Sequence, residues 1–230
     1  MRINKYLSSS GLGSRRSVEK LILDGKVILN GQRVDKLATD VSDSDEVLVE
    51  GEKIGKVEKV YYLVNKPRGY ISSCGSTKNE KKITDLVPSN PKVFPVGRLD
   101  KNSEGLIVLT NDGDYAYSLQ HPKFLHEKEY IVDVFYKSPH FGRELKKVIH
   151  LFSEGILIDK RRTTPARITI LSQGFNKASL KIILHEGRNR QIRRTIGKTK
   201  LEIKTLERVR IGDFIIGDIS SGCYKKIYPV

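Results

Sequence analysis

Hydrophobic residues recur with helical spacing at the start of the chain and in short strand-like runs soon afterwards. Apolar positions three or four residues apart predict helices over residues 3–11 and 15–24. Ser14 directly precedes the second helix and suits an N-cap. Asn30–Gly31 predicts the turn of a β-hairpin. The expected strands cover residues 27–29, 32–34 and 47–49. We therefore expect residues 1–55 to form a compact helix–helix–hairpin unit.

The pattern changes after a stretch rich in glycine and charge, residues 51–60. This stretch has few apolar anchors and is typical of a linker, which we place at residues 56–60. Beyond it, strand-like runs dominate, without regular alternation of strands and helices. The expected strands are 61–64, 106–109, 130–135, 167–171 and 179–184, and the expected helices are 114–119, 143–151 and 189–197. This order predicts an α+β domain over residues 61–230, built on a mixed, mainly antiparallel sheet with flanking helices.

The charge distribution indicates a polyanionic partner. The chain carries a net charge of +15. Residues 61–230 hold 31 Lys and Arg against 17 Asp and Glu, whereas residues 1–60 hold 11 against 10. The densest block, residues 181–210, has ten basic residues against three acidic ones. Even dispersion of charge would indicate solubility alone, but clustering of this kind favours binding to nucleic acid.

Several classes of protein are disfavoured by what the sequence lacks. It has no apolar run of about eighteen residues that could span a membrane. Its first residues lack the apolar core of a signal peptide. Cys74 and Cys223 are far apart and are the only cysteines, which argues against a disulfide framework or a zinc ribbon and favours a cytoplasmic location. The five histidines lack metal-ligand spacing, and no phosphate-binding glycine loop or nucleophile elbow is present.

Three constellations of residues could carry chemistry. Arg98 and Asp100 lie in a turn-rich stretch before strand 106–109, although an aspartate there could simply cap a turn. Glu186–Arg194 combines a glycine with a run of arginines that could bind phosphate, or could form a solvated helix face. Tyr130 begins a strand, where it could stack on an extruded base or belong to the core.

Taken together and in this order, the motifs resemble those of bacterial pseudouridine synthases that modify ribosomal RNA and carry an N-terminal S4 RNA-binding domain. The resemblance covers nearly the whole chain. It rests on residues 1–51, Leu63–Gly69, Phe94–Asp100, Ser103–Leu106, Leu109–Gly113, Lys128–Tyr130, Glu186–Arg194 and Leu206–Gly212. Two positions depart from the family pattern. Thr195 stands where the family usually has methionine, which affects local packing, and Phe124–Leu125 is less typical, which affects contacts to RNA.

The resemblance implies a role for each matching residue. Asp100 is the essential carboxylate, Tyr130 packs on the uracil, and Arg193 pairs with Asp100. The implied substrate-binding residues are Arg98, Leu206, Arg188, Arg190, Arg194, Arg15, Arg16 and Lys5. The carboxylate could attack the sugar, attack carbon 6 of the base or abstract a sugar proton, and the sequence does not choose among these routes.

The implied reaction is the isomerisation of a uridine in ribosomal RNA, with 23S RNA preferred. It needs no external donor or redox step, so we expect no cofactor and no metal. The expected partner is ribosomal RNA or a pre-ribosomal particle, bound by a monomer without membrane attachment. The alternatives are 16S ribosomal RNA or transfer RNA as substrate, and a catalytically idle RNA-binding assembly factor.

Overall fold

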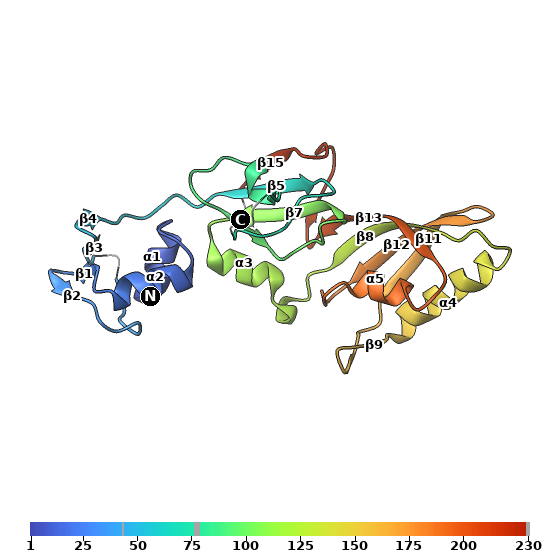
Figure 1. The fold of residues 1–230 in the computed structure, drawn as a ribbon, viewed down its shortest axis with the longest axis horizontal. Coiled ribbons are helices and arrows are strands. Elements are labelled where there is room, and N and C mark those ends of the chain that lie inside the picture. Colours follow the sequence, from blue (N-terminus) through green and yellow to red (C-terminus); the bar gives the residue numbers. More distant parts are fainter. Residues whose placement is uncertain (43, 76–78, 229–230) are drawn as a thin grey trace.

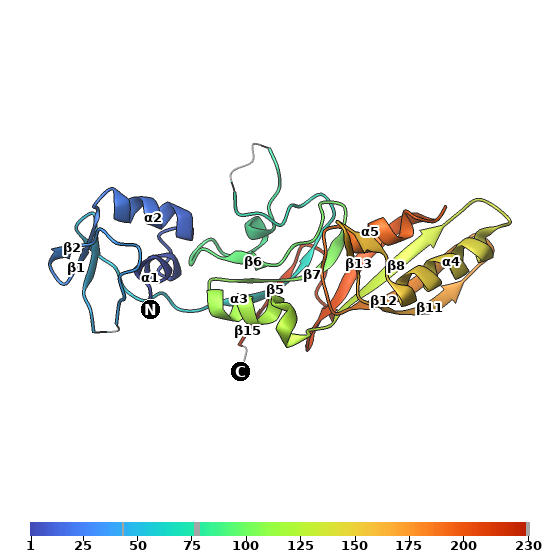
Figure 2. The same ribbon diagram turned by 90° about the horizontal axis from the view of Figure 1, so that it is seen from below.

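The chain folds into a small N-terminal unit and a larger body, joined by an extended segment (Figure 1). The structure is a computed structural model that describes residues 1–42, 44–75 and 79–228. Both perpendicular ribbon views show an elongated molecule with the N-terminal unit at one end (Figures 1 and 2). In the described part of the chain, no helix has the length and apolar character needed to cross a membrane.

The N-terminal unit contains the two helices and the hairpin that the sequence predicts. Helices α1 (Ile3–Ser9) and α2 (Arg15–Leu23) precede a four-stranded antiparallel sheet. Ser14 caps α2 by accepting a hydrogen bond from the backbone N–H of Ser17. Asn30 and Gly31 both have positive φ, as the predicted hairpin turn requires. The strand order is β2–β1–β3–β4, with bounds β1 Val27–Leu29, β2 Gln32–Arg33, β3 Val47–Val49 and β4 Glu52–Lys53.

Strand β4 places the first part of the glycine- and charge-rich stretch 51–60 in the N-terminal sheet. Glu52 and Lys53 pair with Val49 and Leu48, so the chain turns back at Gly51 and completes the small sheet. Both side chains of β4 are exposed, which left no apolar signal for a strand. The segment without helix or strand covers residues 54–60 and contains the expected linker, residues 56–60.

The body is built on a mixed, mainly antiparallel sheet, as predicted. Its strand order is β11–β12–β8–β13–β7–β5–β15, and β14 and β6 pair with β13 and β7. The β13–β7 pair is parallel and the other described pairs are antiparallel. The bounds are β5 Tyr61–Lys66, β6 Phe94–Val96, β7 Glu104–Thr110, β8 Lys128–Phe135, β11 Arg167–Gln173, β12 Lys177–Leu184, β13 Glu202–Ile211, β14 Phe214–Ile215 and β15 Tyr224–Ile227.

Three α-helices and several short elements flank the sheet. They are η1 Ile83–Leu86, α3 Gly113–Gln120, η2 Pro122–Phe124, α4 Phe141–Glu154, the hairpin of β9 Leu157–Ile158 and β10 Arg161–Arg162, and α5 Gln191–Ile196. Helices α4 and α5 cover the part of the sheet formed by β8, β12 and β11 (Figure 2). Buried residues at helical spacing on α4, such as Phe141, Leu145, Val148 and Phe152, pack there against Val132 and other strand residues.

The hydrophobic pattern did not predict the central strand β13 or the short strands β6, β9, β10, β14 and β15. Strand β13 is ten residues long, but five of its residues are charged, which hides its alternating pattern. The chain at Gly105 runs so close to β13 that an added Cβ would overlap the carbonyl oxygen of Arg208, and Gly105 has φ +101°. Only glycine suits such a close approach with positive φ. This contact fixes the start of β7, next to the loop that forms part of the candidate site.

Candidate active site

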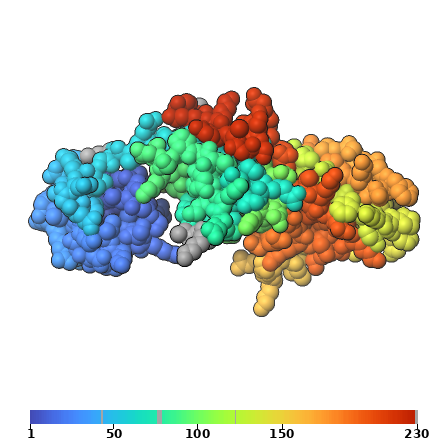
Figure 3. Space-filling view, turned by 45° about the horizontal axis from the view of Figure 1, so that its top comes forward, coloured from blue at the N-terminus to red at the C-terminus, as the bar shows by residue number. Residues whose placement is uncertain are grey.

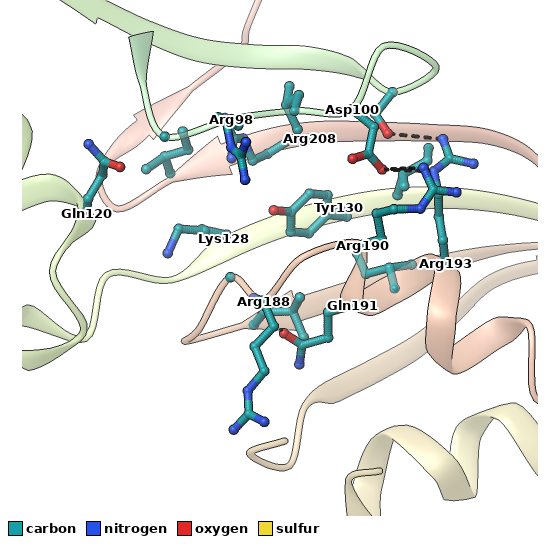
Figure 4. Close-up of a pocket in the computed structure, with 18 of the residues that line it drawn as sticks. Arg98, Asp100, Gln120, Lys128, Tyr130, Arg188, Arg190, Gln191, Arg193 and Arg208 are labelled. Atoms are coloured by element: carbon teal, nitrogen blue, oxygen red, sulfur yellow. Dashed lines mark hydrogen bonds and ion pairs between the residues drawn. The ribbon is translucent and has the colours of Figure 1, made fainter. Parts of the chain in front are cut away.

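A pocket opens at the junction of the β6–β7 loop, strands β8 and β13, and the start of α5. Asp100 lies in the β6–β7 loop and lines this pocket together with Tyr130 of β8 and Leu206 of β13. Figure 4 shows Asp100 at one end with Arg190 and Arg193, Tyr130 in the middle, and Gln120 and Lys128 at the other end. The structure thus brings together residues that lie far apart in the sequence.

Two arginines meet the carboxylate of Asp100. Nε of Arg193 lies 3.3 Å from Asp100 Oδ2, and Nη1 of Arg190 lies 3.5 Å from the same oxygen. Arg193 also donates hydrogen bonds to the backbone oxygen of Asn102 at 2.9 Å and to Ser103 Oγ at 3.0 Å. The pairing of Arg193 with Asp100 agrees with the sequence expectation. The ion pair holds the β6–β7 loop, hereafter the aspartate loop, against α5. The side chain of Asp100 stays 27% exposed toward the pocket.

The local backbone explains how both arginines reach one carboxylate. Arg190 directly precedes α5 and has the left-handed φ of +54°, which turns the chain into the helix. The sequence pattern predicts a helix from residue 189, but α5 begins only at Gln191 because of this turn. A non-glycine residue in this region is uncommon and often marks a functional site.

Tyr130 and Leu206 form the apolar part of the pocket. Both are nearly buried, at 8% and 5% exposure, and both line the cavity. Arg208, which sequence reasoning did not single out, pairs in register with Tyr130 and is 3% exposed. Its Nε donates to the backbone oxygen of Leu106 at 2.8 Å, but its buried Nη2 has no hydrogen-bond partner among the described residues. A buried guanidinium donor that lines a cavity without an acceptor is unusual and costly.

The pocket is strongly cationic. The described residues that line it include one carboxylate, that of Asp100, and the six cations Arg98, Lys128, Arg188, Arg190, Arg193 and Arg208. Burial lowers the pKa of the Lys128 ammonium, and the charge of Arg208 acts in the same direction. Burial also lowers the pKa of the Arg193 guanidinium, while Asp100 opposes this shift. Such a surplus of positive charge suits a polyanionic substrate.

Lys66 supports the β6–β7 loop that carries Asp100. The sequence pattern did not place this lysine in the site. Strand β5 runs to this residue rather than ending at residue 64, and the Lys66 side chain is fully buried. Its Nζ donates to the backbone oxygens of Ser103 at 2.6 Å, Pro67 at 3.0 Å and Lys101 at 3.4 Å. Lys66 therefore ties the part of the loop that follows Asp100 to β5. Because lysines are mostly exposed, a hydrophobicity pattern does not predict that a lysine is buried.

The remaining predicted substrate-binding residues take different positions. Arg98 is exposed and lines the pocket. Arg188 lines the pocket, but its guanidinium is directed away from Asp100 (Figure 4) and donates to the backbone oxygens of Arg161 at 2.8 Å and Arg162 at 2.6 Å. Arg194 contacts both carboxylate oxygens of Asp159 at 3.0 Å.

Arg188 and Arg194 thus hold the β9–β10 hairpin, which projects from the body (Figures 1 and 3). Arg194 is not among the residues that line the pocket. The structure consequently gives both arginines a structural task, and their contact with a substrate remains a prediction.

Lys5, Arg15 and Arg16 belong to the N-terminal unit and do not line the pocket. Arg15 and Arg16 are exposed on the first turn of α2. Lys5 Nζ lies 2.6 Å from Asp114 Oδ1 at the start of α3, so it contacts the body. The same helix α3 ends at Gln120, which lines the pocket.

A cationic pocket whose described lining has one carboxylate at one end and a tyrosine in its middle, together with a small domain that exposes two arginines, suits an enzyme that acts on a base of RNA. Comparisons with known proteins agree. The profile of the RNA pseudouridylate synthase family matches residues 60–198, and that of the S4 domain matches residues 1–47.

Curated relatives and a solved structure match over nearly the full length. Ribosomal large subunit pseudouridine synthase B of Bacillus subtilis is 35% identical over 231 residues, covering 99% of this chain and 92% of the relative. An uncharacterized RNA pseudouridine synthase of Aquifex aeolicus is 36% identical over 99% of this chain and 90% of its own length. A crystal structure of a pseudouridylate synthase has a TM-score of 0.65 at 26% identity, covering 99% of this chain and 96% of that one. The chain belongs to the RNA pseudouridylate synthase family and carries an N-terminal S4 domain.

Proposed function

We propose that this pseudouridine synthase converts a uridine of large-subunit ribosomal RNA to pseudouridine, with Asp100 as its catalytic carboxylate. The observation that carries the proposal is the placement of Asp100 at one end of the pocket. There it is bound by Arg190 and Arg193 and lies next to Tyr130, which lines the same pocket. The name of the relative from Bacillus subtilis supports the large-subunit substrate.

The reaction is an isomerisation, so every atom stays with the nucleotide or returns from solvent. The bond between the sugar and nitrogen 1 of uracil breaks, the base rotates, and carbon 5 bonds to the sugar. Carbon 5 loses its proton and nitrogen 1 gains one. In our proposal Asp100 supplies the carboxylate that opens this sequence, and Arg193 and Arg190 hold it in position. Tyr130 packs on the uracil, which must leave its stack to reach the pocket.

Arg208 is the group that we assign to recognition of the uracil. Its buried Nη2 has no hydrogen-bond acceptor among the described residues and lies in the wall that carries Tyr130. A uracil carbonyl oxygen is an acceptor that would satisfy this donor. Binding the base would then offset the cost of burying the Nη2 donor without an acceptor.

The surrounding cations bind the RNA backbone in this proposal. Arg98 lies in the motif of Asp100, is exposed at the pocket and assists in displacing the target base. Residues 1–55 dock a neighbouring RNA segment through Lys5, Arg15 and Arg16, and residues 56–60 link this domain to the catalytic domain. Docking of this kind raises the effective concentration of the catalytic domain at its target.

Replacement of Asp100 by asparagine tests the proposal. We expect Asp100→Asn to lower the single-turnover rate on 23S RNA by roughly 10³-fold or more, as loss of a central catalytic group does. RNA affinity should change by only a few-fold because the side chain keeps its shape. Tritium release from RNA labelled at carbon 5 of uracil measures the reaction, with 16S RNA and transfer RNA as parallel substrates. Asp218→Asn, at an exposed residue outside the pocket, is the matched control.

Three outcomes contradict the proposal in different ways. Full activity of Asp100→Asn would remove Asp100 from catalysis. Reaction on 16S RNA or transfer RNA alone would change the substrate. A wild-type protein that binds all three RNAs but releases no tritium from any would favour a catalytically idle RNA-binding factor.

A further inference from the structure

A cluster of aromatic rings lies on the surface where α3 leads through η2 into β8. The aromatic cluster comprises Tyr117, His121, Phe124 and His126. Tyr117 is 52% exposed and Phe124 is 44% exposed. Aromatic side chains of soluble proteins are more often buried than this, and a group of them at one place marks a binding surface.

The rings of the aromatic cluster contact one another and share a cation. The centroids of Tyr117 and His121 are 4.7 Å apart, and those of Tyr117 and Phe124 are 6.4 Å apart. Phe124 and His126 lie 6.2 Å apart with an interplanar angle of 29°. Lys123 Nζ lies 4.7 Å from the centroid of Phe124 and 5.5 Å from that of Tyr117. The surface thus presents flat apolar faces next to one positive charge.

Leu125, next to Phe124 in this segment, has an unusual backbone conformation and an exposed side chain. Leu125 has φ +53°, a left-handed conformation that leucine seldom adopts, and its side chain is 68% exposed. The sequence had already set Phe124–Leu125 apart as untypical of the family. Strain of this kind persists where the surrounding structure requires it and gathers at sites that bind ligands.

The aromatic cluster borders the pocket on the side of the N-terminal domain. Gln120, which lies between Tyr117 and His121 in the sequence, and Lys128, two residues after His126, both line the pocket at the end opposite Arg193 (Figure 4). The other end of α3 contacts the N-terminal domain through the ion pair of Lys5 with Asp114. RNA that is bound by that domain and also enters the pocket would pass over α3 and the aromatic cluster.

We propose that the aromatic cluster is a stacking site for a nucleobase of single-stranded RNA next to the target uridine, and that Lys123 binds an adjacent phosphate. The proposal rests on the proposed function, because it takes RNA in the pocket as given. Charge complementarity favours RNA as the occupant, since Lys123 has no carboxylate partner among the described residues. The carboxylates on either side of this segment in the sequence are already paired, Asp114 with Lys5 and Glu127 with Arg210.

Binding of single-stranded RNA to full-length variants tests the site. The probes are a labelled oligouridylate of about 12 nucleotides, within the size that single-strand sites cover, and an RNA duplex of the same length. We expect Phe124→Ala and Tyr117→Ala to weaken binding of the single strand roughly ten-fold, as loss of base–aromatic stacking does, and to leave duplex binding unchanged. Phe175→Ala removes the same ring from an 85% exposed position in the β11–β12 turn and is the matched control.

Lys123→Gln separates stacking from charge. This variant should reduce the slope of log affinity against log salt for the single strand by about 0.7, the value for one neutralised phosphate. Phe124→Ala should leave that slope unchanged, because it removes a ring and no charge. Circular dichroism checks that each variant remains folded.

The outcomes distinguish this site from the proposed function. If the wild-type protein forms pseudouridine and both alanine variants bind the single strand as tightly as it does, the stacking site is wrong and the proposed function stands. If the variants lose single-strand affinity while the wild type forms no pseudouridine in any RNA, the stacking site stands and the proposed function fails. Equal losses on the duplex and in Phe175→Ala would also overturn the stacking site.

Discussion

The buried lysine beneath the aspartate loop leads to a prediction about stability and pH. Lys66 is fully buried, and its Nζ donates to the backbone oxygens of Pro67, Lys101 and Ser103. Burial lowers the pKa of Lys66 from its ordinary 10.5 to about 8, although the charges of Glu104 and Asp100 oppose the shift. Replacement by methionine, Lys66→Met, keeps the length of the side chain and removes its titration.

The sign of the effect follows from where the proton is bound. Below pH 8 both the folded and the unfolded protein carry the proton on Lys66. As the pH rises from 8 to 10.5, the folded protein has released this proton while the unfolded chain retains it, so the free energy of unfolding rises. Each pKa unit is worth about 1.4 kcal/mol, which gives a gain of about 3 kcal/mol across this window. The Lys66→Met variant lacks this gain.

Tyr61 acts in the opposite direction at higher pH. Burial and a hydrogen bond to Asp112 raise its pKa to about 12. Its unfolded form therefore loses a proton before the folded form does, and stability falls above about pH 10. The wild-type protein and Lys66→Met share this effect, so the difference between them isolates Lys66.

Urea unfolding followed by far-ultraviolet circular dichroism measures this difference, since the chain has no tryptophan. Both proteins are unfolded at pH values from about 7 to about 10, and the difference in free energy is plotted against pH. Lys147→Met, at an exposed position on α4, is the control and should give a flat line over this range. A wild-type to Lys66→Met difference that is equally flat, or that declines with pH, would refute the reasoning.

Three further predictions concern the pocket and the N-terminal domain. Tyr130→Phe should reduce activity modestly and Tyr130→Ala strongly, because the ring supplies stacking of roughly 1–3 kcal/mol; equal losses in single-turnover rate would point to the hydroxyl instead. Arg208→Met should retain the fold, judged by circular dichroism, and weaken RNA binding or turnover at least ten-fold, while unchanged kcat/KM would remove Arg208 from substrate recognition. Deletion of residues 1–56 should weaken RNA binding and flatten its salt dependence, by about 0.9 in the logarithmic slope for each duplex phosphate that the protein no longer binds. A deletion variant with unchanged affinity but a collapsed maximal rate would show that this domain helps to assemble the active site.

Local patterns were sufficient for much of the fold. The hairpin at Asn30–Gly31 and the cap at Ser14 depend on the backbone preferences of neighbouring residues, so they could be predicted from short segments. The buried core of β7 appeared as an uninterrupted apolar run over residues 106–109. The order of the motifs likewise indicated the family before any contact was known.

Strands with a mixed environment were harder to predict. β13 lies between β8 and β7 in the sheet, yet five of its ten residues are charged, and one of these, Arg208, is buried. Arg208 is buried in this strand because its guanidinium reaches the backbone oxygen of Leu106 on the neighbouring strand. A local hydrophobicity pattern treats such an arginine as exposed, because the partner that permits its burial is remote in the sequence.

The local elements and the chemical groups available to the site could be inferred from the amino-acid sequence, because periodicity, turn preferences and residue type are properties of short segments. How those groups are used depends on the folded chain. The fold brings Arg190 and Arg193 to Asp100, sends Arg188 and Arg194 to the β9–β10 hairpin instead, and buries Lys66 beneath the aspartate loop. An arginine can contact a phosphate, a carboxylate or a backbone oxygen with nearly equal ease, so its partner is selected by the long-range packing of strands and helices.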